Sequence, residues 1–159
     1  TRKQLVGHNK AVIMVQKGNP SKIDANLDNL TNNKFGVMIG NPESGSIGKE
    51  TKQILEKKGN YHAVIQNVMS LTTDSKNLVK VIKQKKADIV INWFATSTWD
   101  NNSEYIDVIQ IDPEFSKVNN LVLGLLKYSQ QTEIANRIID FAISEEGVKI
   151  FRKHGLYFD

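Results

Sequence analysis

The sequence contains no cysteine. Disulfide bonds and metal sites built from thiolates are therefore excluded, while an oxidising compartment is compatible with the sequence but not required by it. Long apolar runs are absent as well, because no stretch approaches the roughly 18 consecutive apolar residues that a membrane-spanning helix needs. The sequence thus predicts a chain without a membrane-spanning segment.

No block of like charge interrupts the chain, although 21 Lys and Arg against 17 Asp and Glu give a net charge of +4. The densest basic pairs, Lys57 with Lys58 and Lys85 with Lys86, fall where helices are expected to end. Cations there complement the helix dipole, so we interpret the pairs as solvated helix ends rather than a nucleic-acid patch. With 40% hydrophobic residues over 159 positions, the chain can form one compact domain or two small lobes.

Signatures of catalysis and of metal binding are missing too. There is no G-x-S-x-G elbow and no cysteine nucleophile. His8, His62 and His154 are far apart and lack the spacing of metal ligands. Asp107 and Asp112 lie on or beside an expected strand, where their odd spacing puts them on opposite faces, so we interpret them as structural. The sequence therefore predicts neither an enzyme nor a bound cofactor or metal ion.

The first half of the chain alternates expected strands with expected helices. Apolar runs at 11–15, 35–39 and 87–93 read as buried strands, and the alternation at 61–68 predicts a further strand. Helices are expected at about 46–58, with Gly59 as the stop, and from the N-capping residues 72–74 to Lys86. This order favours an α/β fold with a mainly parallel sheet over residues 11–95.

The second half begins with a composition shift near residues 96–120, which is the best candidate for a lobe boundary. A polar loop at 96–104 precedes expected strands at 105–111 and 121–126. Two helices are then expected, at about 132–143 and 145–154.

The stretch from Gly40 to Lys49 is the most informative about function. A Gly- and Ser-rich turn that opens a helix leaves backbone N–H groups without acceptors at the positive end of the helix dipole, which suits an anion. Ser44 and Ser46 lie in this turn. The stretch is not a P-loop, because Glu43 stands where that motif needs glycine. The alternative is an ordinary turn in which Ser46 is merely the N-cap.

A second helix start, at residues 72–76, follows the neighbouring strand, so both helix N-termini should open on one edge of the sheet. In open α/β sheets, ligands bind in the crevice beyond the carboxyl ends of the strands. Ser75 is the candidate there, with simple capping as the alternative. Trp93 ends a buried strand at the same edge, where it either walls a pocket or packs in the core. Asn92 either faces a ligand or ties down the following loop.

Four stretches stand in a distinctive order: residues 9–20, residues 39–43 followed by Gly48, residues 86–93, and a tail whose Ser-x-Glu-Gly turn at 144–147 joins two helices that finish at Gly155. Together they resemble the periplasmic molybdate- and tungstate-binding proteins of ABC importers. The match covers nearly the whole chain, and the combination is specific although each stretch alone is weak.

The resemblance implies the two-lobed type II periplasmic-binding-protein fold, with the anion held in a cleft between the lobes by hydroxyls and backbone amides. It implies the end of the first lobe and a hinge at 1–10, the second lobe at 11–104, and the return crossing and C-terminal part of the first lobe at 105–159. The N-terminal part of the first lobe would be missing.

By the same resemblance, the second lobe would contact the ligand through the amide of Ile47, through Ser75 and through Trp93. The family often has Tyr where this chain has Trp93, and Asp is common where it has Asn41. A bulkier indole donor changes the pocket, so the identity of the anion stays open.

We therefore expect a solute-binding protein that captures a small oxyanion, such as molybdate or tungstate, for an ABC importer. The expected partners are the ligand and the transporter permease, with no nucleic acid. The expected location is periplasmic or extracellular, with a lipoprotein anchor as an option. Residues 121–126 and the helix at 132–143 should leave apolar surface uncovered, so a missing N-terminal segment or a second copy is expected to cover it. The alternative function is the effector-sensing domain of a transcription regulator, which uses the same fold.

Overall fold

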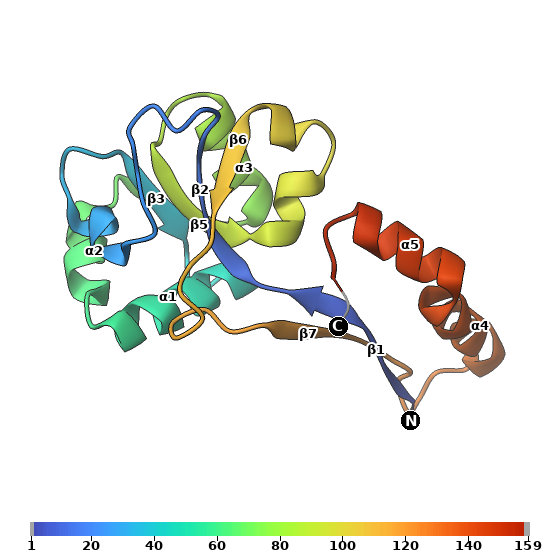
Figure 1. Cartoon of the computed structure of the whole chain (residues 1–159). Coiled ribbons are helices and arrows are strands. Elements are labelled where there is room, and N and C mark those ends of the chain that lie inside the picture. The colour runs from blue at the N-terminus through green and yellow to red at the C-terminus, as the bar shows by residue number, and fades with distance from the viewer. Residues whose placement is uncertain (1, 158–159) are drawn as a thin grey trace. The chain divides into compact units, whose positions relative to one another are not determined.

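The computed structural model describes residues 2–157, which form two compact units. One unit consists of residues 10–117. The other combines the two ends of the described chain, up to Asn9 and from Val118 onward. Figure 1 shows the elements of each unit.

Residues 10–117 build one five-stranded sheet with the order β4-β3-β5-β2-β6 (Figure 1). β3 runs parallel to β4 and β5, whereas β2 runs antiparallel to β5 and β6. The sheet is therefore mixed, where a mainly parallel one was expected. The reason is that only the crossovers from β3 to β4 and from β4 to β5 contain α-helices, which parallel neighbours normally need. The strands are β2 (Ala11–Gln16), β3 (Val37–Gly40), β4 (Ser70–Thr72), β5 (Ile89–Trp93) and β6 (Ile106–Ile109).

The core of this unit is centred on β2 and β5. The first five residues of β2 and the first four of β5 are all buried, so both faces of these strands are covered, as expected for residues 87–93. Helix α1 buries the predicted apolar face of Ile47, Ile54 and Leu55 and ends at Gly59, whose left-handed backbone closes the last turn. The helices are α1 (Ser46–Lys58), α2 (Tyr61–Asn67) and α3 (Ser75–Lys83), with short 3-10 helices η1 (Leu27–Thr31), η2 (Phe94–Thr98) and η3 (Asn102–Glu104).

The strand expected at 61–68 is wrong, because this segment forms helix α2 and the strand β4 comes only afterwards. Tyr61, Val64 and Val68 follow the helical spacing of three and four residues, and they pack against the core. The Asn67 side-chain amide fixes the end of α2 by donating to the carbonyls of Leu30 and Asn32. The helical spacing and these long-range hydrogen bonds favour a helix more strongly than the alternating pattern of residues 61–68 favours a strand.

The other unit pairs β1 (Lys3–Asn9) antiparallel with β7 (Asn119–Gly124). Helices α4 (Thr132–Ile143) and α5 (Glu145–Lys153) pack against each other and against β1. The two helices expected at 132–143 and 145–154 are thus confirmed. Ser144 is the N-cap of α5, because its hydroxyl oxygen accepts the amide of Gly147 over 3.2 Å.

The α/β class and the partition into two units agree with the expected periplasmic-binding-protein architecture. The boundary differs in place. Residues 105–117 were expected with the first lobe, whereas the structure groups them with residues 10–104 because β6 pairs with β2. The predicted loop at 96–104 is also more ordered than expected, since it contains most of η2 and all of η3.

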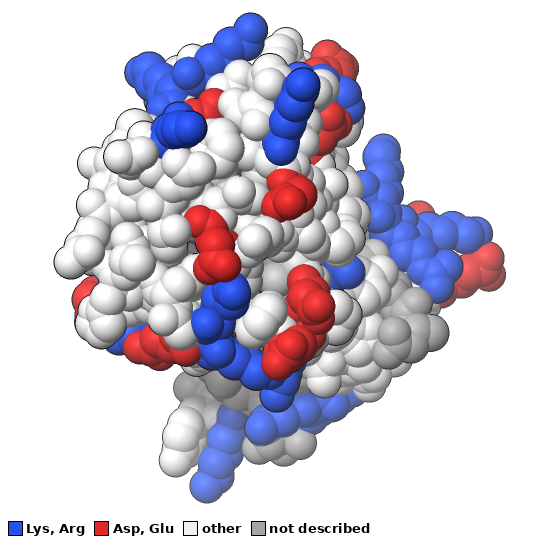
Figure 2. All heavy atoms as spheres, turned by 60° about the vertical axis from the view of Figure 1, so that its left-hand side comes forward, with Lys and Arg blue, Asp and Glu red and all other residues white. Residues whose placement is uncertain are grey.

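Charged side chains of both signs are interspersed on the face of the molecule seen in Figure 2. The basic pair at the end of α1 contacts neighbouring segments, since Lys57 donates to the Glu114 carbonyl and Lys58 forms an ion pair with Asp28 at 3.2 Å. This agrees with the interpretation of that pair as a helix end. Within the described part of the chain, no helix has the length and apolar character needed to cross a membrane.

Candidate functional site

The turn from β3 into α1 approaches the helix very closely. The Asn41 carbonyl accepts the amides of Ser44 and Gly45, and the Asn41 side chain accepts the amide of Glu43. A Cβ on Gly48 would lie 2.2 Å from the Asn41 carbonyl oxygen, so only glycine fits there. The Ser44 hydroxyl donates back to the same carbonyl at 3.5 Å. The turn is thus folded onto the first turn of α1, and Ser44 serves the turn itself.

The start of α1 is the structural feature that best suits an anion. Its N-cap is Gly45, which has no side chain to accept the first amides, and the first turn carries no acidic residue. The backbone ladder begins with the Lys49 amide bonding to the Gly45 carbonyl. The amides of Ser46, Ile47 and Gly48 therefore have no intrahelical acceptor at the positive end of the dipole.

Trp93 joins this helix start from the end of β5. Its indole Nε1 donates to the Ser46 hydroxyl oxygen at 3.3 Å, and the Trp93 side chain is half-buried. Because the Ser46 oxygen accepts this bond, the hydroxyl hydrogen stays available to donate to another group. Ser46 is exposed, so that donor is accessible. Two of the predicted site residues, on different elements, are thus in direct contact.

The second helix start lies next to the first. The Asn41 amide donates to the Thr72 carbonyl at 2.8 Å, and a Cβ on Gly45 would lie 3.2 Å from the Thr73 carbonyl. Helix α3 is capped, however, because the Asp74 carboxylate accepts the Asn77 amide at 2.9 Å. This bond is the main reason that the pKa of Asp74 lies below its ordinary value. The capping interpretation therefore holds for Asp74, whose negative charge lies at the start of α3.

Asn92 connects the two predicted contact residues at this edge. Its side chain is fully buried; Nδ2 donates to the Ser75 carbonyl at 3.0 Å, and Oδ1 accepts the Trp93 amide at 2.9 Å. The structure thus links Ser75, Asn92, Trp93 and Ser46 in one chain of hydrogen bonds. These bonds favour a structural role for Asn92, in which it holds neighbouring backbone in place, over direct contact with a ligand. Sequence reasoning did not single out the Trp93 contact with Ser46, because it joins residues 47 positions apart.

Asp107 and His8, which the sequence analysis considered, both form ordinary structural contacts. Asp107 forms an ion pair with Lys17 at 2.9 Å and accepts the Gly18 amide at 2.8 Å. The hydrogen bond from Lys17 is the main cause that lowers the pKa of Asp107. His8 hydrogen-bonds Asn120 through Nδ1 at 2.8 Å. Across residues 2–157, no three His, Asp or Glu side chains gather in a way that suits a metal ion.

Solved structures of low sequence identity share this fold. PEB3 with bound L-phospholactate has a TM-score of 0.79 and 21% identity, covering 99% of this chain and 68% of PEB3, which a second structure assigns to Campylobacter jejuni. The substrate-binding domain of a molybdenum ABC transporter from Clostridium difficile has a TM-score of 0.74 and 20% identity. The match covers 99% of this chain and 67% of that domain. The sulfate-binding protein SubI from Mycobacterium tuberculosis has a TM-score of 0.74 and 16% identity. The match covers 94% of this chain and 56% of SubI.

Comparison with curated proteins gives no match. A family model described as bacterial extracellular solute-binding protein matches residues 2–157. This match extends over nearly the whole chain, and the fold agrees with it. The chain therefore belongs to the family of bacterial extracellular solute-binding proteins.

Proposed function

We propose that this solute-binding protein captures a small tetrahedral oxyanion, of the molybdate or tungstate kind, for an ABC importer. The observation that carries the proposal is the uncapped start of α1 beside a serine hydroxyl that Trp93 orients. The proposed role is reversible binding without a covalent step, so the chain is not proposed to be an enzyme.

The proposed ligand is held by neutral donors. The amides of Ile47 and Gly48 and the Ser46 hydroxyl supply hydrogen bonds, and the dipole of α1 adds a favourable potential. Trp93 forms a wall, and its indole N–H is already used on Ser46. Ser75 contributes from the second helix start, where the carboxylate of Asp74 opposes an anion. The ligand is therefore proposed to lie closer to α1 than to α3.

The names of similar structures support this chemistry. L-phospholactate carries a phosphate group, sulfate is itself a tetrahedral oxyanion, and the third name contains the metal of molybdate. Phosphate, sulfate and molybdate share a tetrahedral arrangement of oxygens around a central atom. We therefore propose the oxyanion class for this chain, with molybdate and tungstate as the first ligands to test.

The proposal includes the transporter permease as a partner and a periplasmic or extracellular location, with a lipoprotein anchor as an option. The proposal also includes a protein contact that buries the exposed apolar surface in the unit formed by the chain ends. On α4, Ile134, Ile138 and Phe141 are 55%, 58% and 51% exposed. We propose that the described chain covers this surface with a second copy when no further segment supplies it.

Light scattering tests the second-copy part of the proposal. A dimer whose fraction rises with protein concentration is expected. Ile138→Asp should shift the protein to monomer, because a buried carboxylate is costly at an apolar contact. Gln130→Asp, at an exposed neutral residue of the same unit, is the charge-matched control. A wild-type protein that stays monomeric and melts cooperatively would contradict the second-copy proposal.

Thermal unfolding tests the oxyanion proposal. A ligand that binds only the folded state adds about 2.7 kcal/mol of stability at one hundred times its dissociation constant. Molybdate, tungstate or sulfate should therefore raise the melting temperature, whereas chloride at equal ionic strength should not. Equal melting temperatures in all four salts would count against the proposal.

A further inference from the structure

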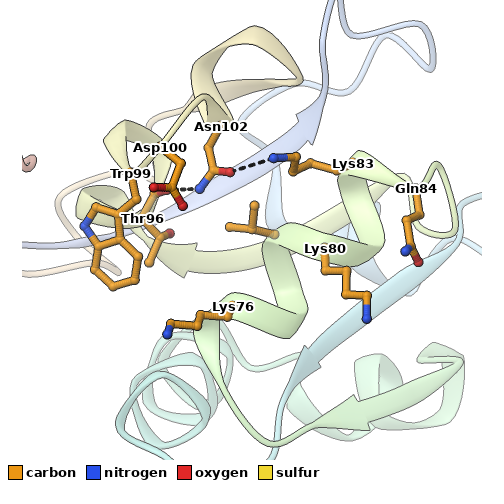
Figure 3. Close-up of a pocket in the computed structure, with 9 residues that line it drawn as sticks. Lys76, Lys80, Lys83, Gln84, Thr96, Trp99, Asp100 and Asn102 are labelled. Carbon is orange, nitrogen blue, oxygen red and sulfur yellow. Dashed lines mark hydrogen bonds between the residues drawn. The ribbon is translucent and has the colours of Figure 1, made fainter.

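A pocket of about 390 Å³ lies in the unit of residues 10–117, between α3 and the segment that carries η2 and η3 (Figure 3). We call it the α3 flank pocket. Its volume falls within the range of pockets that hold small molecules. None of the residues proposed to hold the oxyanion lines this pocket: Ser46, Ile47, Gly48, Ser75 and Trp93. The lining side chains that matter here are Lys76, Lys80 and Lys83 from α3 and Thr96, Trp99 and Asn102 from the facing segment.

The wall opposite α3 is held in place by hydrogen bonds. Lys83 Nζ donates to the side-chain oxygen of Asn102 at 3.1 Å, and Asn102 Nδ2 donates to the Thr96 carbonyl at 2.8 Å (Figure 3). Lys83 Nζ also donates to the side-chain oxygen of Asn101 at 3.1 Å. Thr96 and Asn102 are buried. The wall is thus organised before any ligand arrives. Lys83 is used for this purpose, and its ammonium group also lies 4.7 Å from the centroid of the Tyr105 ring.

The pocket carries an excess of positive charge. Its lining includes three lysines and one acidic residue, Asp100. Lys76 and Lys80 are four residues apart and lie on one face of α3. Neither forms an ion pair with a carboxylate of the described chain. The charge of Lys76 is the smallest of the causes that lower the pKa of Asp74. These two ammonium groups are therefore available to an anionic ligand.

Trp99 gives the pocket a flat apolar wall. Its side chain is half-buried, and the buried Val79 adds a second apolar surface from α3. An inorganic anion would use only the lysines. A planar group would in addition contact the indole ring, since aromatic pairs contribute beyond the apolar area that they bury.

We propose that the α3 flank pocket is a second ligand site, which binds an organic anion that carries a planar ring next to its charged group. The ring lies against Trp99, and the anionic group binds beside it at the Lys76 ammonium group. The side chain of Lys80, which points away from Trp99 in Figure 3, turns toward the anion when it binds. The site is independent of the proposed oxyanion site, so one protein molecule binds both ligands at once.

Phenyl phosphate is the probe, with inorganic phosphate as the comparison that lacks the ring. In a Trp93→Phe variant, Trp99 is the one remaining tryptophan of the chain, so its fluorescence reports on the pocket. Phenyl phosphate should change this fluorescence saturably and at lower concentration than inorganic phosphate. Lys76→Gln and Lys80→Gln should each weaken its binding about two- to tenfold, as expected for partly exposed ion pairs, and added salt should weaken it further.

Lys85→Gln is the matched control, because Lys85 follows the end of the same helix and does not line the pocket. Its phenyl phosphate affinity should equal that of the parent. In the wild-type protein, calorimetry of phenyl phosphate with and without saturating molybdate should give the same affinity. Displacement by molybdate, equal affinity in the Lys80→Gln variant, or no change in Trp99 fluorescence would each overturn the proposal. The fluorescence and lysine-variant results do not depend on whether molybdate itself binds.

Discussion

The indole Nε1 of Trp93 donates a hydrogen bond to the hydroxyl oxygen of Ser46 at 3.3 Å. This bond joins the end of β5 to the first turn of α1, where the N-cap glycine provides no side chain. It leaves the hydroxyl hydrogen of Ser46 available as a donor. The aromatic residue that the sequence offered as a pocket wall therefore orients a polar group beside it.

Ser46→Ala should weaken oxyanion binding. The substitution removes a hydroxyl that donates to a charged ligand, and such bonds contribute about 1.5–3 kcal/mol. Calorimetry should show this loss with little change in unfolding free energy, because Ser46 is exposed. Ser103→Ala, at another exposed serine, is the control and should bind like the wild type. Equal affinities in the two variants would remove Ser46 from the site.

Trp93 should report ligand binding by fluorescence. The chain has two tryptophans, and only Trp93 contacts the proposed oxyanion site. Adding the oxyanion should change the emission of the wild type, and Trp93→Phe should abolish most of that change. Trp99→Phe should preserve it. A Trp93→Phe variant that keeps the full signal would show that the ligand lies elsewhere.

Asn92→Ala should destabilise the unit of residues 10–117. The side chain is fully buried, and its removal leaves the Ser75 carbonyl and the Trp93 amide without their present partner. The expected loss is about 1–3 kcal/mol, the cost of leaving a buried polar group unsatisfied. Urea unfolding followed by circular dichroism measures it. Asn33→Ala, at an exposed asparagine, should unfold at nearly the wild-type urea concentration.

Gly48→Ala should disturb the start of α1. The added methyl would lie 2.2 Å from the Asn41 carbonyl oxygen, so the backbone must move. Overpacking of this kind costs about 1–3 kcal/mol, and displacement of the Ile47 and Gly48 amides should weaken oxyanion binding as well. Gly124→Ala, where the methyl would meet no atom within 4 Å, is the control. The expectation fails if both variants have the stability and affinity of the wild type.

Sequence reasoning located α1 well because several local signals agree there. The spacing of Ile47, Ile54 and Leu55 indicates one buried face, and Gly59 adopts the left-handed conformation that ends helices. Segment 61–68 was harder, since Tyr61, Val64 and Val68 also fit a helix. The bonds from Asn67 to the η1 region could not be inferred from local sequence, because they join residues more than 30 positions apart.

The candidate site was predictable as an edge of the sheet but not as a set of contacts. Strand order and helix starts placed Ser46, Ser75 and Trp93 at one edge, and the hydrogen bonds of the structure connect them through Asn92. Asn92 had two open interpretations because its burial depends on how α3 packs on β5. Whether these residues contact a ligand stays a prediction.

Calorimetric titration of the protein with molybdate, tungstate and sulfate tests the proposed function most directly. At least one of these anions should bind with one site per chain. Its binding free energy should be less favourable by about 1.5–3 kcal/mol in the Ser46→Ala variant. The absence of heat from all three anions, in a protein that unfolds cooperatively and at several temperatures of titration, would contradict oxyanion capture at the start of α1.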